Sequence, residues 1–271
     1  MSRFSVQNIL DYANLGEISR QRQFILPAIA AGGLSLATYL TFSYRGWLAL
    51  GRGGLPFNPL GYLINLSLHA IARTDLRTPA PYMLEGLEDT YGPWARRSFF
   101  GGVLPPERVG PRPDVPSYVA PQRQTSERAT PEMIALMEAF LEALVTANQD
   151  ILEIRPSGLE GPRHNAAWLA DGLSTKPKFL KGTRGEFFHV HKEGSTHMIL
   201  SLTDATTAIQ SFWAERHGLS GVASGLPPWG YVLIYAPRDE EEFKVWQSFA
   251  AASARFIITA ADGPKDISIP A

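Results

Sequence analysis

The chain has 271 residues, of which 45% are hydrophobic and 19% charged, and its formal net charge is −1 at neutral pH. This composition fits a packed core, and the near-neutral charge provides no global attraction to nucleic acid, so we expect no nucleic-acid partner. The chain contains no cysteine, which excludes disulfide bridges, thiolate catalysis and cysteine-ligated zinc.

The N-terminal part contains an uncharged apolar segment, residues 24–42. Its length is about that of a membrane-spanning helix, and Arg20, Arg22 and Trp47 flank it as interfacial anchors do. We therefore expect residues 1–60 to form an N-terminal anchor in contact with membrane lipid, with a transmembrane helix over 24–42. The alternative is a buried core helix or a re-entrant hairpin.

The sequence of residues 61–129 predicts an irregular segment with short helices. An apolar stretch over 60–71 is too short to cross a bilayer. Residues 78–122 are rich in proline and glycine and show little periodicity. Such a stretch is either a linker or a wrap around the next domain, and its aromatic side chains favour the wrap.

From Thr130 onwards the pattern alternates between helical and strand periodicity, which predicts a domain over residues 130–271. Thr130 and Asp239 are suited to cap the first and last helices. The predicted order is a helix from 130, strands over 152–156, 165–170, 186–191 and 196–202, a helix over 203–216, a strand over 229–236 and a final helix. This order indicates an α+β fold in which helices pack on an antiparallel or mixed sheet.

Three of the six histidines lie in the short run HVHKEGSTH, residues 189–197. Residues two apart in a strand face the same side, and residues 192–194 fit a three-residue hairpin turn with glycine in the left-handed conformation. This register pairs His189 with His197 and places His191 on the same face. Such a face can move protons on a bound enol or phenol or hold a divalent metal; the alternative is an exposed polar strand face.

A second cluster, Trp213, Arg216 and His217, is expected where the helix over 203–216 ends, before Gly218. A tryptophan, an arginine and a histidine together can bind a planar, polyoxygenated ligand by stacking and charge. The alternative is that the basic residues only complement the dipole of the helix C-terminus.

Three spaced motifs resemble the fungal luciferases and their luciferase-domain relatives. They are E-x-x-H-x-H at residues 186–191, W-x-x-R-H-x-L-x-G at 213–221 and W-x-x-x-x-x-Y-A-P-R-x-E-E-E at 229–242. The resemblance is dense over residues 183–262 and looser but colinear upstream, where it includes the Gln-Arg-Gln run at 122–124.

The resemblance implies an O2-dependent oxidoreductase in the endoplasmic reticulum (microsomal) membrane. Fungal luciferases add O2 to 3-hydroxyhispidin, a styryl-pyrone luciferin, and form a cyclic peroxide that loses CO2 and leaves an excited product that emits light. The implied partners are therefore a small aromatic substrate and O2. We expect no cofactor, and the alternative is a divalent metal at the histidine cluster.

Carried onto this sequence, the resemblance implies that a histidine of the 189/191/197 face removes the proton of the substrate 3-hydroxyl, while Arg216 or His217 stabilises the developing oxyanion. The residues expected to contact the substrate are His164, Glu186, Trp213, Trp229, Tyr231 and Tyr235.

The chain departs from the luminescent members of the family within and just after the hairpin turn. Where those members carry further histidines, this chain has Gly194, Ser195 and Ile199. The alternatives are therefore a non-luminescent homologue that acts on another aromatic enol or pyrone, or a histidine-rich module that binds a metal or ligand without catalysis.

Overall fold

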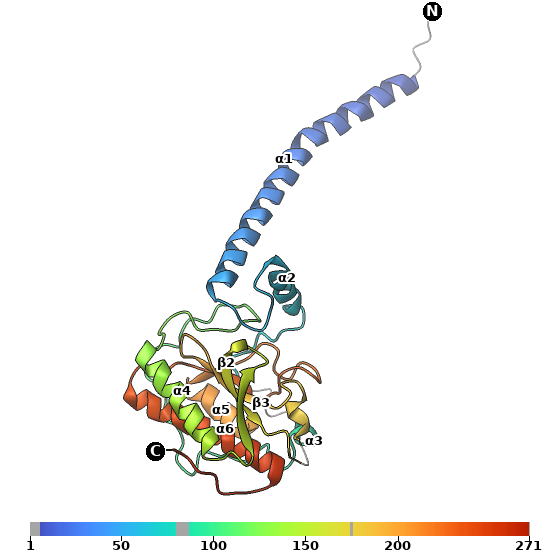
Figure 1. Ribbon diagram of the computed structural model, residues 1–271. Coiled ribbons are helices and arrows are strands. Elements are labelled where there is room, and N and C mark those ends of the chain that lie inside the picture. Colours follow the sequence, from blue (N-terminus) through green and yellow to red (C-terminus); the bar gives the residue numbers. More distant parts are fainter. Residues whose placement is uncertain (1–5, 80–86, 174–175, 271) are drawn as a thin grey trace, which may run out of the picture. The chain divides into compact units, whose positions relative to one another are not determined.

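The computed structural model describes residues 6–79, 87–173 and 176–270. The chain divides into two compact units, Met1–Ala49 and Leu50–Ala271. The first unit is a single helix, α1 (Val6–Ala49), drawn in blue in Figure 1. Its part Phe24–Ala49 has a mean hydropathy of 1.6 and is long and apolar enough to cross a membrane. The expected apolar helix is thus present, although a signal sequence near an N-terminus has the same properties.

A six-stranded antiparallel sheet forms the centre of the second unit, in the order β1-β2-β3-β4-β6-β5. The sheet and its helices confirm the expected α+β fold. Its strands are β1 (Leu152–Ser157), β2 (Gly161–Leu169), β3 (Glu186–Val190), β4 (Thr196–Ile199), β5 (Ala214–Arg216) and β6 (Tyr231–Ile234).

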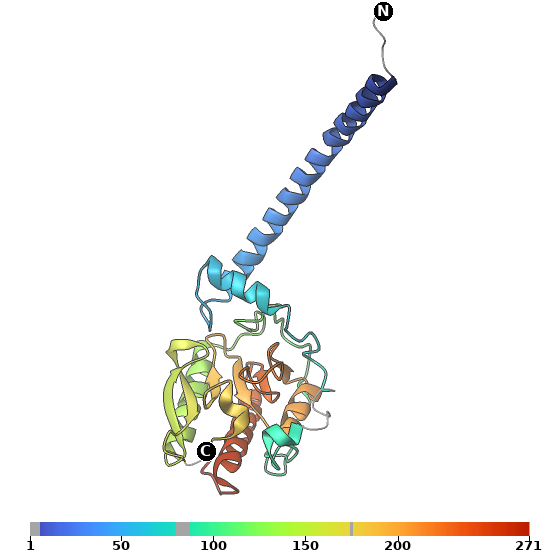
Figure 2. The ribbon, with the colours of Figure 1, turned by 90° about the vertical axis from the view of Figure 1, so that its right-hand side faces the viewer.

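Helices α4 (Pro131–Thr146) and α6 (Glu240–Asp262) pack against one face of this sheet and against each other (Figures 1 and 2). The ring of Trp246 lies 5.6 Å from that of Phe188 and 6.0 Å from that of Phe140, measured between centroids. Because side chains alternate along a strand, Phe188 of β3 belongs to this apolar face and its neighbour His189 to the other.

Both long helices begin at the residues that the sequence indicates. Thr130 Oγ1 accepts a hydrogen bond from Met133 N at 3.2 Å, and Asp239 Oδ1 accepts one from Glu242 N at 2.9 Å. These side chains satisfy amide groups that have no partner within the helix. The remaining helices are α2 (Pro59–Leu68), α3 (Leu87–Tyr91), α5 (Leu202–Gln210) and the short 3₁₀ helix η2 (Lys178–Lys181).

The predicted helix over 203–216 is wrong in its C-terminal part, because α5 ends at Gln210 and the last residues form the edge strand β5. Phe212 takes a φ of 64°, and Trp213 N donates to Ala208 O at 2.9 Å. This is the hydrogen-bond pattern of a Schellman motif, in which the left-handed position usually holds glycine. Here the bulky Phe212 holds it, so the glycine signal at 218 was misleading.

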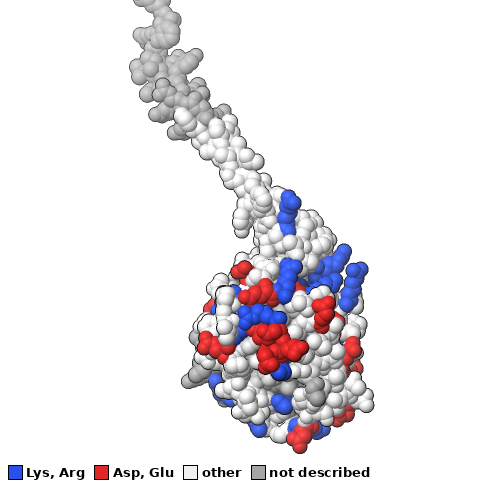
Figure 3. All heavy atoms as spheres, turned by 90° about the vertical axis from the view of Figure 1, so that its left-hand side faces the viewer, with Lys and Arg blue, Asp and Glu red and all other residues white. Residues whose placement is uncertain are grey.

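Residues 92–130 contain no helix or strand. They are nevertheless tied to the rest of the second unit. Asn65 Oδ1 accepts hydrogen bonds from the amides of Val119 and Ala120 at 2.9 and 3.0 Å, and Gln122 and Arg123 are almost fully buried. Acidic and basic side chains mix on the face of the second unit shown in Figure 3.

Candidate functional site

Strands β3 and β4 form the hairpin that the histidine run predicts. His189 pairs with His197, and His191 N donates to Ser195 O at 2.8 Å where the turn begins. Gly194 takes a φ of 93°, and a Cβ at this position would lie 2.4 Å from a neighbouring side chain. Both the turn and the packing therefore require glycine, and the predicted register is confirmed.

The three hairpin histidines meet in the protein interior, where each is at most 3% exposed. The ring of His191 lies 5.1 Å from that of His189 and 4.7 Å from that of His197. Glu160 joins them from the turn between β1 and β2. Its Oε1 lies 3.5 Å from Nε2 of His191 and 3.7 Å from Nε2 of His189. These four residues are called the histidine–glutamate cluster below, and one ligand atom from each lies within 4.8 Å of all the others.

A carboxylate orients the ring of His189. Oε1 of Glu186 lies 2.7 Å from Nδ1 of His189, so this nitrogen carries the proton and donates. Glu186 is itself held by the hydroxyl of Ser157 at 2.7 Å and by the amide of Gly158 at 2.8 Å. This pairing is the carboxylate–histidine arrangement that fixes a tautomer.

His191 and His197 are oriented in the same manner by other groups. Nδ1 of His191 lies 2.8 Å from Oγ of Ser195, whose hydroxyl donates to Glu193. Nε2 of His197 lies 3.2 Å from Oε1 of Gln122. The amide nitrogen of Gln122 donates to Glu215 Oε1 and to a backbone carbonyl, both at 3.1 Å, which leaves its oxygen to face the imidazole.

The buried charges of the cluster act on one another. Burial raises the pKa of the Glu160 carboxyl, but His191 and the Arg123 guanidinium outweigh burial and hold that pKa well below its usual range. Burial and Arg123 lower the pKa of His191, whereas Glu160 and Glu193 raise it, and the net shift is upward. Burial and the neighbouring imidazoles hold the pKa of His197 well below its usual range. His197 is therefore neutral at physiological pH.

His217 and Tyr231 border the cluster. The ring of Tyr231 stacks on His197 at 4.6 Å, and the ring of His217 lies 5.3 Å from His197. Nδ1 of His217 accepts a hydrogen bond from Leu219 N at 3.1 Å. Burial lowers the pKa of His217 to about 4, so this imidazole is also neutral.

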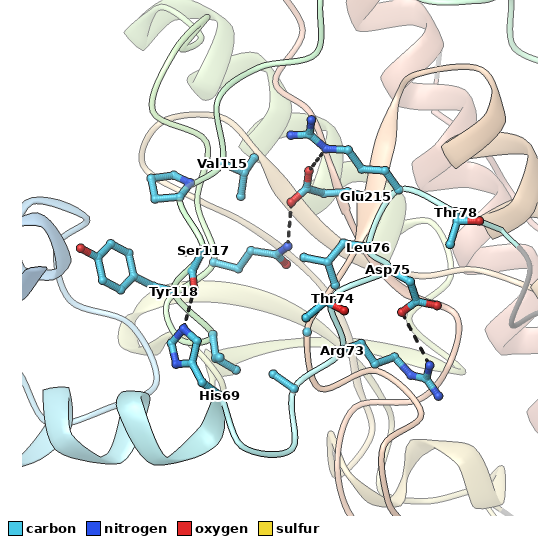
Figure 4. Close-up of a pocket in the computed structure, with 16 residues that line it drawn as sticks. His69, Arg73, Thr74, Asp75, Leu76, Thr78, Val115, Ser117, Tyr118 and Glu215 are labelled. Carbon is cyan, nitrogen blue, oxygen red and sulfur yellow. Dashed lines mark hydrogen bonds and ion pairs between the residues drawn. The ribbon is translucent and has the colours of Figure 1, made fainter.

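The second unit contains a cavity of about 590 Å³ (Figure 4). Two segments of the N-terminal half line it, 69–78 and 115–122, together with Glu215 and Gly218. Gln122 lines the cavity and also contacts His197, so it connects the cavity to the cluster. Residues from the irregular part of the chain thus form most of the lining of this cavity.

Arg216 and Tyr235 hold this lining in place. Arg216 is fully buried, and its Nη1 donates to the backbone carbonyl of Asp75 at 3.0 Å. The hydroxyl of Tyr235 donates to Glu215 Oε2 at 3.0 Å, and Arg77 donates to the same oxygen at 2.9 Å. Both residues therefore contact groups that line the cavity.

The other residues singled out from the sequence lie around the cluster. Trp213 is in the core, where its Nε1 donates to Pro106 O at 2.7 Å. The guanidinium of Arg73 lies 3.9 Å above the ring of Trp229. His164 is half-buried on β2, and burial lowers its pKa. The structure thus brings Glu186, Tyr231 and His217 to the hairpin histidines but not Trp213.

Sequence reasoning missed Glu160 and the polar residues that orient the histidines: Gln122, Arg123, Glu193 and Ser195. Glu160 lies in a short turn between two strands, where an acidic residue is unremarkable. The run at 122–124 was noticed only through the resemblance, because it has no periodicity that predicts an element. Only Ser195 and Glu193 had a usable signal, since the hairpin register places both beside His191.

Comparison with known proteins finds similarity to the fungal luciferases. Residues 184–253 match the family model of the luciferase domain. The chain is 27% identical over 242 residues to the luciferase of Armillaria mellea, covering 85% of this chain and 86% of that protein. It is 24% identical over 243 residues to the luciferase of Neonothopanus nambi, covering 83% and 85%. The chain therefore contains a luciferase domain and is similar to the fungal luciferases over most of its length.

The luciferase domain runs from just before β3 to within α6 and contains all three hairpin histidines. Glu160, Gln122 and Arg123 lie before it. The resemblance inferred from the three motifs is confirmed by these relatives. No solved structure gives a significant match.

Proposed function

We propose that this chain is an O2-dependent oxidoreductase of the luciferase type that acts on 3-hydroxyhispidin. The observation that carries the proposal is the buried, oriented histidine hairpin of the luciferase domain, together with the cavity. His189, His191 and His197 are the proposed catalytic groups, with Tyr231 and His217 beside them.

The cavity suits a flat, polyoxygenated molecule. Its volume of about 590 Å³ is in the range of small-molecule sites. Arg73 and Arg77 line it, and guanidinium groups bind oxygen anions through charge-assisted hydrogen bonds. Apolar side chains such as those of Val115 and Val119 also line the cavity, and they complement an aromatic ring.

The proposed reaction begins at the 3-hydroxyl of the pyrone, which the histidine face converts to its enolate. The enolate is electron-rich enough to reduce O2, and both oxygen atoms add to the pyrone as a cyclic peroxide. Loss of CO2 then leaves a caffeoyl-pyruvate-type product in an excited state. Burial of the cluster excludes water from this step, which favours emission over quenching.

The test is to mix the purified full chain with 3-hydroxyhispidin in air and to record O2 uptake and light together. We expect both signals, and we expect His189→Ala to reduce them at least about 100-fold, as loss of an acid–base group does. The matched control is Glu241→Gln, an exposed change on α6. O2 uptake without light would show that the protein is a non-luminescent homologue. The absence of both signals would overturn the proposal.

We propose in addition that Phe24–Ala49 anchors the chain in the membrane of the endoplasmic reticulum. The side chains of residues 24–42 are exposed, and Arg45 is the one charged residue within Phe24–Ala49. We expect the full chain to stay with membranes in alkaline carbonate and a chain without residues 1–49 to be released. N-terminal sequencing of the membrane-bound protein separates an anchor from a signal sequence, because a cleaved chain would lack this segment.

A further inference from the structure

We propose that the histidine–glutamate cluster, Glu160, His189, His191 and His197, binds one divalent first-row transition metal ion. The inference rests on the hydrogen bonds, distances and charges of the cluster. It does not depend on which substrate the protein uses, and it makes the three imidazoles ligands of the ion in place of free bases.

The protons of the three imidazoles point away from the centre of the cluster. In a neutral imidazole one nitrogen donates and the other accepts. Nδ1 of His189 faces the acceptor oxygen of Glu186. Nδ1 of His191 faces Ser195 Oγ, whose own proton is given to Glu193. In both rings the outer nitrogen therefore carries a proton, and when the ring is neutral Nε2 has the lone pair that can bind an ion.

In His197 the two ring nitrogens exchange roles, but the nitrogen with the lone pair again faces the centre of the cluster. Its Nε2 faces the oxygen of Gln122, so Nε2 carries the proton and Nδ1 has the lone pair. Nδ1 of His197 lies 3.3 Å from Nε2 of His189. With all rings neutral, no proton is available between these two nitrogens, and two lone pairs face each other in a buried site.

Glu160 adds a fourth acceptor to this centre. Its Oε1 lies 3.5 Å from Nε2 of His191, which has no hydrogen-bond partner among the residues that the structure describes. The other oxygen of Glu160 is held by Arg123. When the three rings are neutral, four lone-pair atoms thus converge without a donor between them, and a buried polar atom without a partner is costly. A cation at the centre satisfies all four.

The separations agree with atoms that share one ion. Ligands bound at about 2.0–2.1 Å in a tetrahedral arrangement lie about 3.4 Å apart. The measured separations are 3.3 Å between His197 Nδ1 and His189 Nε2, and 3.5 and 3.7 Å from Glu160 Oε1 to the two Nε2 atoms. Small side-chain movements bring the four atoms to bonding distance.

Charge supports the same conclusion. Glu160, Glu186 and Glu193 are each at most 8% exposed, and Arg123 contacts Glu160 and Glu193. With neutral imidazoles, three carboxylates and one guanidinium give a formal charge of −3 + 1 = −2. Buried charges require compensation, and a divalent ion supplies it.

The donor set indicates the class of metal. Imidazole nitrogen with one carboxylate suits Mn²⁺, Fe²⁺, Co²⁺, Ni²⁺, Cu²⁺ or Zn²⁺, whereas Ca²⁺ and Mg²⁺ prefer oxygen ligands. Glu186, Ser195 and Gln122 supply the outer hydrogen bonds that orient ligating histidines in metal proteins. An ion here would also lower the pKa of a bound enol hydroxyl as a Lewis acid. We therefore prefer a divalent metal at the histidine cluster, given as the alternative in the sequence analysis, to a site without a cofactor.

The test measures metal on the protein alone. The full chain is purified with a tag that contains no histidine, stripped with a chelator and dialysed against Mn²⁺, Fe²⁺, Co²⁺ or Zn²⁺ in turn. Bound metal is then determined by elemental analysis, and thermal unfolding is recorded with and without each ion. We expect about one equivalent of at least one ion, and a melting temperature that rises with its concentration.

The variants Glu160→Gln and His191→Ala locate the site. We expect each to weaken binding more than about 100-fold, since loss of an orienting residue already costs 10–100-fold. His69→Gln, an exposed histidine outside the cluster, is the matched control and should bind like the parent. Glu160→Gln preserves the shape of the side chain and so guards against a loss caused by misfolding. The proposal is overturned if the parent binds none of the ions, or if both cluster variants bind as the parent does.

Discussion

Oε1 of Glu186 lies 2.7 Å from Nδ1 of His189, and both side chains are at most 1% exposed. The contact sets which nitrogen of the imidazole carries the proton, and so it turns Nε2 towards Glu160 and His197. Glu186, three residues before His189 on β3, therefore determines that Nε2 is the nitrogen of His189 that faces the cluster.

The change Glu186→Gln tests this relationship. The amide can still accept from Nδ1, but it lacks the charge that fixes the proton there. We expect kcat for O2 uptake with 3-hydroxyhispidin to fall about 10–100-fold, as when an orienting partner is lost, while KM changes little. The far-ultraviolet circular dichroism spectrum and melting temperature serve as the folding control. A kcat equal to that of the parent would show that the carboxylate has no positioning role.

The change Gly194→Ala tests the hairpin turn. The backbone at Gly194 has a φ of 93°, and an added Cβ would lie 2.4 Å from Cβ of Ala129. We expect the free energy of unfolding to fall by about 1–3 kcal/mol, measured by chemical denaturation.

The matched control for this turn is Gly172→Ala. A Cβ at Gly172 meets nothing within 4 Å, and its φ is not positive. This change should be neutral or stabilise the fold by up to about 1 kcal/mol. Equal effects of the two changes would contradict the requirement for glycine at 194.

Asp204 gives a prediction about pH. Burial raises the pKa of this carboxyl to about 6, although hydrogen bonds from Ser98 and from the amide of Phe99 oppose the shift. The folded protein therefore keeps the proton at pH values where the unfolded chain, with the usual value of 3.8, has lost it. The contribution of Asp204 to stability is present below about pH 4 and is lost as the pH rises through 6.

Asp204→Asn removes this dependence. The difference in unfolding free energy between variant and parent should shift in favour of the variant by up to about 3 kcal/mol between pH 4 and pH 7.5. Urea titrations at four pH values across this range provide the measurement. A difference that stays constant with pH would mean that Asp204 titrates normally.

Arg73→Ala tests the cavity. Arg73 lines the cavity and lies 3.9 Å above the ring of Trp229, so it can present a positive charge to a bound oxygen anion. We expect KM for 3-hydroxyhispidin to rise about 10-fold with kcat nearly unchanged, which is the result of losing a contact made equally in the ground and transition states.

The control for this change is Arg155→Ala. Arg155 also lies above a tryptophan ring, that of Trp168, at 4.6 Å, but it belongs to β1 and not to the cavity. It should leave KM unaltered. A similar rise in KM for both variants would show that the effect of Arg73 is not local to the cavity.

Local periodicity explains which parts of the structure could be predicted. The side-chain period of a strand is two, so the turn length alone places His189, His191 and His197 on one face. Helix caps such as Thr130 are likewise local signals. Phe212 was not foreseen because its positive φ contradicts the preference of its residue type.

The cluster itself depends on contacts between residues that are distant in sequence. Glu160 meets His191 across the sheet, and Gln122 reaches His197 from 75 residues away. Neither the turn at 158–161 nor the segment 115–122 has a pattern that points to the histidines. No single-sequence signal records such contacts, so these residues emerged only from the three-dimensional arrangement.

The position of Glu160 has a consequence for sorting relatives of this chain. The luciferase domain, residues 184–253, holds the three imidazoles but not the carboxylate. A protein can thus retain the whole domain, and with it the hairpin, while another residue replaces the acid on the preceding turn. The residue at this one turn, between the first two strands, would therefore distinguish relatives that keep the fourth acceptor from relatives that lack it.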